Sequence, residues 1–293
     1  PAAAAEPPPA APGAEALRTS VRNTALWLAR GVDSWFGDKP FSDGGSVTEG
    51  RLGLGLLHRP PDDGSVSLRF NARVRLPNLE DKAYVFVGRD NPREVITDQP
   101  GAFTRPQRLQ PETSEDTRFF AGVGVLLRES TDLRVGIRGG LKPYVQLRWR
   151  HAVPLGEQAL ADFRQTFFWT VDDHLGSTTA LSLERELHPD LALRWLVSGT
   201  VTQDSGRLAV ASNLGAYRSF GLRRQLALEL IATAEQRTGV GLTDYGLQAR
   251  WQQPLHVDWL VGEVLVGHFW PRADASVPRE PGWAAGLTLT LHF

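Results

Sequence analysis

The sequence predicts an all-β chain: a transmembrane, antiparallel, up-and-down β-barrel of about 14 strands, with 12 also compatible, and with an N-terminal amphipathic helix. Two observations carry this prediction. From about residue 46 onward, apolar and polar residues alternate with a period of two, as successive side chains of a strand do. Turn residues divide this region into about 14 short segments, which is the spacing of a meander or barrel.

The residues before the alternating region divide into two segments. Residues 1–13 are a Pro/Ala tract that cannot pack a core, so we expect a linker. In 14–45, apolar residues recur at spacings of three and four, which predicts an amphipathic helix followed by a connector. The apolar face of this helix contains Leu17, Val21, Leu28, Val32 and Trp35.

Residues 46–293 are expected to form the barrel. In 66–76, for example, Val66, Leu68 and Phe70 alternate with polar residues. The same alternation occurs in 143–151, 190–202, 225–236, 244–252 and 282–293. Most connections are short, but the one from about 89 to 115 is much longer and contains four prolines. The pieces GLGLL and GVGVLL lie within strands and open no helix, so they are not phosphate-binding loops.

Composition excludes several classes of function. With 32 basic and 33 acidic side chains, the net charge of -1 gives no long-range attraction to nucleic acid. Cysteine is absent, which excludes disulfides, thiolate nucleophiles and cysteine-bound metals. Methionine is absent too, and we expect a processed chain that has lost its signal peptide. No apolar run is long enough for a membrane helix, whereas a barrel strand needs an apolar residue only at every second position.

Three features place the apolar face outside, against lipid. A closed barrel of this size has a lumen too wide for side chains to fill. The longest connection falls at the end opposite the chain termini, an asymmetry usual in membrane barrels. Aromatic residues also gather near strand ends, as in the two girdles of membrane barrels. The predicted girdles are Trp169, Tyr245, Trp270 and Trp283 at one rim, and Trp149, Trp251 and Phe293 at the other.

The last strand resembles the C-terminal signature of Gram-negative outer-membrane β-barrel proteins, which is a run of alternating apolar residues ending in an aromatic one. The residues that carry the resemblance are Leu287, Leu289, Leu291 and Phe293. It implies a closed antiparallel barrel in the outer membrane, inserted by the barrel-assembly machinery and surrounded by the lipid bilayer. With an even number of strands, the N-terminus is expected in the periplasm. The signature names a superfamily and no particular family.

With the polar face inward, charged residues of each sign gather on neighbouring strands. The predicted basic wall comprises Arg69, Arg73, Arg75, Arg118, Arg128, Arg134, Arg138, Arg148, Arg150 and Arg164. The predicted acidic wall comprises Glu184, Glu186, Glu229, Glu235 and Glu263. Opposed walls produce a transverse field, and guanidinium groups suit carboxylates or phosphates. The alternative is that these charges only pair with one another or solvate a water-filled lumen.

Several inward positions are apolar, among them Tyr84, Phe86, Phe120, Leu196 and Leu265, and something must cover them. Inward glycines such as Gly286 permit the close approach of another element. We expect the N-terminal helix to enter the lumen as a plug. Its rival is a helix at the periplasmic interface that docks a partner protein.

The sequence therefore predicts a channel or transporter for a small anionic or zwitterionic solute, gated by the helix and by the 89–115 connection. The alternative is a sealed structural, secretion or assembly-complex barrel. The predicted combination of 14 strands with an N-terminal plug also resembles the outer-membrane fatty-acid transporters at the level of the fold, without a shared motif. An apolar substrate is therefore a further alternative. No cofactor is expected, and the histidines show no metal-ligand spacing.

A lipid-modifying hydrolase is the second alternative. Its candidate residues are Asp172, Asp173, His174 and Ser177, with His268 on a neighbouring rim. No serine-hydrolase signature surrounds them, and a turn rich in Asp, Gly and Ser is usually only a turn. We therefore expect no enzyme.

Overall fold

The structure is a computed structural model of the 293-residue chain. It describes residues 15–16, 18–20, 22–23, 46–60, 62–75, 82–104, 106–110, 118–221, 224–236, 240–255, 257–272 and 278–293. Among these residues, no helix is both long and apolar enough to cross a membrane.

Fourteen β-strands occur in the described part of the chain. They are β1 (Ser46–Arg59), β2 (Asp62–Arg75), β3 (Ala83–Asp90), β4 (Arg118–Arg128), β5 (Thr131–Arg138), β6 (Lys142–Pro154), β7 (Ala159–Thr170), β8 (His174–His188), β9 (Leu191–Thr202), β10 (Leu208–Ser219), β11 (Gln225–Gln236), β12 (Val240–Leu255), β13 (Val257–Phe269) and β14 (Gly282–His292). The alternating segments seen in the sequence are therefore strands.

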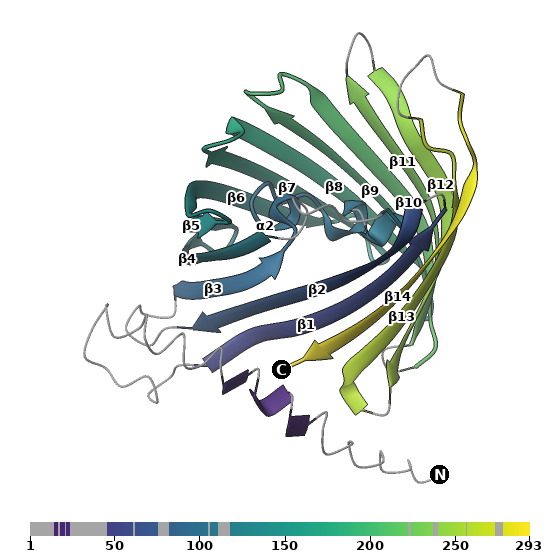
Figure 1. Cartoon of the computed structure of the whole chain (residues 1–293), viewed down its shortest axis with the longest axis horizontal. Helices are drawn as coiled ribbons and strands as arrows, with labels where there is room; N and C mark the ends of the chain where they lie inside the picture. The colour runs from purple at the N-terminus through teal and green to yellow at the C-terminus, as the bar shows by residue number, and fades with distance from the viewer. Residues whose placement is uncertain are drawn as a thin grey trace.

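Each strand pairs antiparallel with the next, and β1 pairs with β14, so the sheet closes into one barrel (Figure 1). Because the barrel is closed, no strand has an unpaired edge. The backbone N–H and C=O groups of β1 and β14 therefore find hydrogen-bond partners in each other. The predicted up-and-down barrel of about 14 strands is confirmed. The start of β1 and the end of β14 lie at the same end of the barrel, which we call the termini end. The other is the distal end.

The outer face of the barrel is apolar. Leu54 pairs with Leu289 and therefore shares its face, and the two side chains are 43% and 37% exposed. Leu247 of β12 is 50% exposed on the same surface. A water-soluble sandwich would bury such residues, whereas lipid is their solvent in a membrane barrel. The face containing Thr288 and Thr290 points into the lumen.

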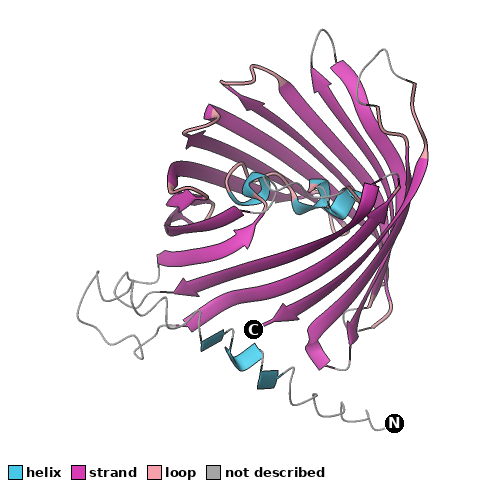
Figure 2. Cartoon of the chain, viewed as in Figure 1, coloured by secondary structure: helices cyan, strands magenta, loops and turns pink. Residues whose placement is uncertain are grey.

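The long connection between β3 and β4 folds into the barrel. Its described residues, 91–104 and 106–110, are called the inner segment. They contain the short helices α2 (Pro92–Val95), η3 (Gly101–Phe103) and η4 (Pro106–Arg108), which lie inside the ring of strands (Figures 1 and 2). α2 begins with Asn91, whose side chain accepts a hydrogen bond from the Arg93 amide, and with proline at its first position.

The inner segment covers inward-facing apolar residues of the wall. Val95 and Ile96 pack against the aromatic group Tyr84, Phe86, Phe120 and Tyr144. Phe103 packs against Leu196 and Ala211. Leu109 packs against Leu265, Phe269 and Ala284, with Leu57 beside them. The cover that the sequence required is thus supplied, among the described residues, by the β3–β4 connection.

Inward glycines make room for large side chains. A Cβ at Gly286 would meet the Leu109 side chain of the inner segment. A Cβ at Gly124 would meet the ring of Tyr84 on the neighbouring strand. The close approach of another element that was expected at the inward glycines occurs at Gly286, whereas the space at Gly124 receives an aromatic side chain of the wall itself.

The five predicted plug-face residues, Leu17, Val21, Leu28, Val32 and Trp35, lie outside the described residues. The described residues near them are helical and lie beside the C-terminus at the termini end (Figure 2). Among them, Arg18 donates a hydrogen bond to the carbonyl oxygen of His292 at 3.3 Å and lies 5.3 Å from the Trp259 ring. The plug stays a prediction.

Candidate functional site

A cavity of about 220 Å³ lies between the inner segment and the wall formed by β1 to β7. Charged side chains dominate its lining. The arginines are Arg51, Arg73, Arg134, Arg148, Arg150 and Arg164, and the carboxylates are Glu49, Glu94 and Asp98. Arginines therefore outnumber carboxylates by two to one. We call it the arginine cavity.

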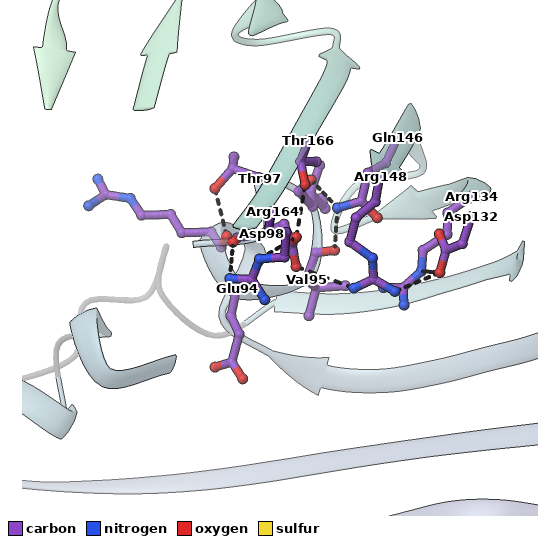
Figure 3. Close-up of polar contacts among 12 residues, drawn as sticks. Glu94, Val95, Thr97, Asp98, Asp132, Arg134, Gln146, Arg148, Arg164 and Thr166 are labelled. Atoms are coloured by element: carbon purple, nitrogen blue, oxygen red, sulfur yellow. Dashed lines mark hydrogen bonds and ion pairs between the residues drawn. The ribbon is translucent and has the colours of Figure 1, made fainter. Parts of the chain in front are cut away.

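The side chain of Asp98 is held by donors from two strands (Figure 3). Its carboxylate accepts hydrogen bonds from Arg148 Nη1 at 3.3 Å and Thr166 Oγ1 at 2.8 Å, and Arg164 Nε lies 3.0 Å from it. Arg164 Nη2 also donates to the Asp98 carbonyl oxygen at 2.9 Å. Beside them, Gln146 Nε2 donates to the carbonyl oxygen of Ile96 at 2.7 Å. These contacts fix the inner segment to β6 and β7.

A second cluster lies on β3, β5 and β6. Asp132 is 5% exposed and accepts hydrogen bonds from Arg148 Nη2 at 2.6 Å and from the Tyr84 hydroxyl at 2.9 Å. Arg134 Nε donates to the same hydroxyl at 2.8 Å. Asp132 therefore supports Arg148 from the wall side, and Arg148 bridges Asp132 and Asp98. Shared partners of this kind hold guanidinium planes in one orientation.

Glu94 lies at the end of the cavity next to β1. Arg51 Nη2 lies 3.4 Å from Glu94 Oε1 and also 3.4 Å from Asp90 Oδ2. Burial raises the pKa of the Glu94 carboxyl, and the nearby Asp90 carboxylate raises it further, while the positive charges of Arg51 and Arg69 oppose both. Glu94 therefore takes up a proton at a higher pH than an exposed glutamate.

Arg73 and Arg150 differ from the other arginines of the cavity. Within the part of the chain that the structure describes, neither has a carboxylate at ion-pair distance. The Arg73 guanidinium lies 3.5 Å from the centroid of the Tyr84 ring, which is a cation–π contact. Arg150 is exposed to the lumen. These two residues give the cavity positive charge that the described carboxylates do not neutralise.

The structure brings half of the predicted basic wall to this cavity: Arg73, Arg134, Arg148, Arg150 and Arg164. The others lie elsewhere. Arg69 lies 3.8 Å from Asp90, and Arg138 pairs with Asp172 at 2.9 Å. Arg75, Arg118 and Arg128 are not part of the cavity lining.

The predicted acidic residues are mostly neutralised. Glu229 is 1% exposed and accepts hydrogen bonds from Gln248, Tyr217, Asn213 and Arg250. The remaining contacts are those of Glu263 with Arg250 at 3.8 Å, Glu184 with Arg194 at 3.1 Å and Glu235 with Arg207 at 3.5 Å, and Glu186 is exposed. These residues form separate ion pairs along β8 to β13 and no continuous acidic surface facing the arginine cavity.

Strand ends place the predicted girdle residues at two levels. Trp169, Tyr245, Trp270 and Trp283 lie near the distal end, and Trp149, Trp251 and Phe293 lie near the termini end. Tyr245 stacks on Trp270 with centroids 5.2 Å apart, and Phe293 stacks on Phe70 at 6.2 Å. Trp283 is 66% exposed.

The hydrolase candidates do not form one site. Ser177 pairs with Phe167 on the outer face, where its hydroxyl accepts a hydrogen bond from Gln165. His174 pairs with Thr170, whose side chain points into the barrel. Successive side chains of a strand point to opposite faces of the sheet, and Ser177 is three positions after His174. Ser177 therefore points outward while His174 points into the barrel, so the two side chains cannot act together. Asp172 is engaged by Arg138 and Lys142.

Sequence reasoning missed four charged residues of the cavity: Glu49, Arg51, Glu94 and Asp98. Arg51 shares its parity with the inward positions Gly53 and Gly55, so the alternation could have found it. Glu94 and Asp98 follow no period. The prolines of the 89–115 connection marked that stretch as unusual, but no local pattern indicates which of its acids meet the wall.

No protein-family model and no curated protein matches the sequence. Solved structures do match. A loop-deletion variant of OmpT, an outer membrane protein of Vibrio cholerae, is 11% identical with a TM-score of 0.52, and the match covers 86% of this chain and 100% of that one. The outer membrane channel DcaP of Acinetobacter baumannii is also 11% identical, with a TM-score of 0.51 and coverage of 88% and 99%. At this identity the likeness concerns the fold alone, and this chain has the fold of the outer-membrane β-barrels.

Proposed function

We infer that the protein is an outer-membrane channel that passes small anionic solutes through the arginine cavity. The observation that carries the proposal is the pair Arg73 and Arg150, which line the cavity without a carboxylate partner among the described residues. Uncompensated charge in a narrow, low-dielectric passage attracts counter-ions and repels ions of its own sign. A barrel whose charges only paired with one another would have no reason to leave these two free.

The chemistry of the lining favours oxyanions. Guanidinium groups present planar pairs of donors that match carboxylate and phosphate oxygens. The cavity of about 220 Å³ limits the solute to a small molecule at any one time. The similarity in fold to an outer membrane channel is compatible with transport, although it does not identify a solute.

The same proposal gives the chain its orientation. The termini end would face the periplasm and the longest connections would lie toward the outside, as is usual for bacterial barrels. The N-terminal helix would then regulate access from the periplasm, either as a plug or by docking a partner protein. The hydrolase alternative gains no support, because Ser177 and His174 lie on opposite faces.

Single-channel recording tests the function. The protein is inserted into planar bilayers under a KCl gradient, and the reversal potential gives the preference for chloride over potassium. We expect anion preference in the wild type and a clear loss of it in the double variant Arg73→Gln/Arg150→Gln. Arg128→Gln is the matched control, because Arg128 also lies on the barrel wall but not at the cavity. Absence of current would favour the sealed barrel, and cation preference would contradict the proposal.

A further inference from the structure

We propose that Arg148, Arg164 and Thr166 form a carboxylate-binding site that Asp98 occupies as an internal ligand, and that a solute carboxylate displaces Asp98 to release the inner segment. The inference rests on the proposed function and names the chemistry that the site recognises. It assigns Asp98 a role as an autoinhibitory ligand.

The three donors belong to the barrel wall and do not depend on the inner segment for their positions. Arg148 and Thr166 are directly opposite each other in the β6–β7 ladder, and Arg164 is two residues from Thr166 on the same face. Side chains at such positions are neighbours on one surface of a sheet. Arg148 is also held from behind by Asp132 at 2.6 Å. The site would therefore persist after Asp98 leaves.

The site is deeply buried for a charged cluster. The side chains of Asp98 and Arg148 are 8% and 11% exposed, and Thr166 is fully buried. Buried guanidinium groups without a partner are strongly unfavourable, so Asp98 cannot simply swing away into water. Exchange of one carboxylate for another avoids this cost, because the donors keep their charge-assisted hydrogen bonds. Displacement is thus favourable only when a competing oxyanion is present.

Two features favour the exchange of Asp98 for a solute carboxylate. The Asp98 backbone has a φ of 57°, in the left-handed region, which residues other than glycine adopt less readily, although aspartate tolerates it better than most. The adjoining arginine cavity also carries Arg73 and Arg150, which raise the local concentration of an incoming anion. A solute carboxylate is attracted by charges that Asp98 does not use.

Chemical rescue tests the site. In the full-length Asp98→Gly variant the left-handed backbone stays accessible, but the carboxylate is gone. We expect this variant to unfold at a lower temperature than the wild type in detergent micelles containing chloride, and acetate at equal ionic strength to restore most of the difference. Asp98→Asn, which also tolerates left-handed backbone, is the second variant. Rescue should disappear in Asp98→Gly/Arg164→Gln.

Two controls separate occupation of the site from a loosened segment. Gln146→Leu removes the hydrogen bond to the Ile96 carbonyl but leaves Asp98 in place, so acetate should not stabilise this variant. In the wild type, acetate should accelerate tryptic cleavage after Arg93 compared with chloride, because it competes with Asp98. Equal effects of acetate and chloride in both assays would overturn the inference.

These measurements need no current through the barrel. Rescue by acetate without any conductance would support the site and contradict the channel. Anion-selective conductance without rescue or accelerated cleavage would leave the channel in place and remove the displaceable Asp98.

Discussion

The inner segment is attached to the barrel wall at two places by different forces. Near its first half, Asp98 is held by the charged donors Arg148 and Arg164. Near its second half, Leu109 is fully buried against Leu265 and Phe269. Both residues have positive φ, of 57° and 51°, so in both places the wall contacts outweigh an unfavourable backbone conformation.

Of these two attachments, only the charged one at Asp98 can respond to a dissolved anion. Apolar packing responds little to the identity of a dissolved anion, whereas a carboxylate in an arginine site can be exchanged for another carboxylate. The Leu109 attachment also includes a hydrogen bond from the Arg59 guanidinium (Nη1) to the uncharged Leu109 carbonyl oxygen at 3.2 Å, which no dissolved carboxylate would replace as a ligand. We therefore regard the Leu109 half as the fixed part and the Asp98 half as the adjustable part.

Removal of the whole inner segment should have the largest effect. Asp90 and Arg118 are paired in the β3–β4 ladder, so a short turn can replace residues 91–117 without altering the strands. Single-channel conductance should rise several-fold, because the described part of the deleted stretch, the inner segment, lies inside the barrel. Deletion of residues 1–40 is the comparison, and a plug predicts that it raises conductance too. A larger increase from the N-terminal deletion would mean that the helix is the main obstruction.

Truncation of the fixed half should have the next largest effect. Leu109→Ala should destabilise the attachment by about 2–5 kcal/mol, the range for removing a buried leucine side chain. Hydrogen exchange of the amides of the inner segment measures this loss. Acetate should not restore protection, in contrast to its effect on Asp98→Gly. Restoration by acetate would contradict the division into a fixed and an adjustable half.

Acidification should change the ion selectivity of the arginine cavity through Glu94, which belongs to the adjustable half of the inner segment. The raised pKa of Glu94 means that it is protonated at a pH where ordinary glutamates, with a pKa of about 4.3, are still charged. Loss of that negative charge makes the cavity more positive, so anion preference should increase as the pH falls from neutrality, before the range in which an exposed glutamate titrates is reached. Glu94→Gln, measured over the same pH range, should show no such change. A wild-type preference that falls on acidification would contradict this assignment.

The smallest effect is expected at an ion pair outside the inner segment. Lys142 Nζ lies 2.7 Å from Asp172 Oδ1, and both side chains are about 40% exposed. The hydrogen bond that Lys142 donates to the Asp172 carboxylate, together with the positive charge of Arg138, lowers the pKa of Asp172. Lys142→Met should change the free energy of unfolding by about 0.5 kcal/mol or less, as exposed pairs do. A larger loss of unfolding free energy in denaturant titrations would mean that this exposed ion pair contributes as much to stability as the buried contacts of Asp98.

Much of the barrel could be predicted from the sequence because its rule is local. In the last strand, Leu287, Leu289 and Leu291 alternate with Thr288 and Thr290, and this alternation indicates which face of the strand meets lipid. The same rule assigns Arg73, Arg148 and Arg150 to the lumen before any strand is paired. The alternation does not predict that Arg69 and Arg138 pair with carboxylates outside the cavity, because distances across a barrel depend on strand register and curvature.

Local sequence patterns did not reveal that the β3–β4 connection covers part of the lumen wall, and the predicted plug helix stays untested because its face lies outside the described residues. The apolar inward residues Leu196 and Leu265 correctly indicated a covering element, and the periodic helix at 14–45 was the most regular candidate. The element that covers them in the described structure, the inner segment, has no period and consists of short helices between prolines. Its position depends on pairing Asp98 and Leu109 with strands that are distant in the sequence.

The solvent of each strand face, the positions of the aromatic residues and the direction in which the arginines point all follow from a side-chain period of two, so they can be read along the chain. Which of those arginines meet, which have no carboxylate partner among the described residues, and which described segment enters the lumen become known only when the strands are paired and the barrel is closed. These properties depend on contacts between residues far apart in the chain, which no short stretch of sequence contains.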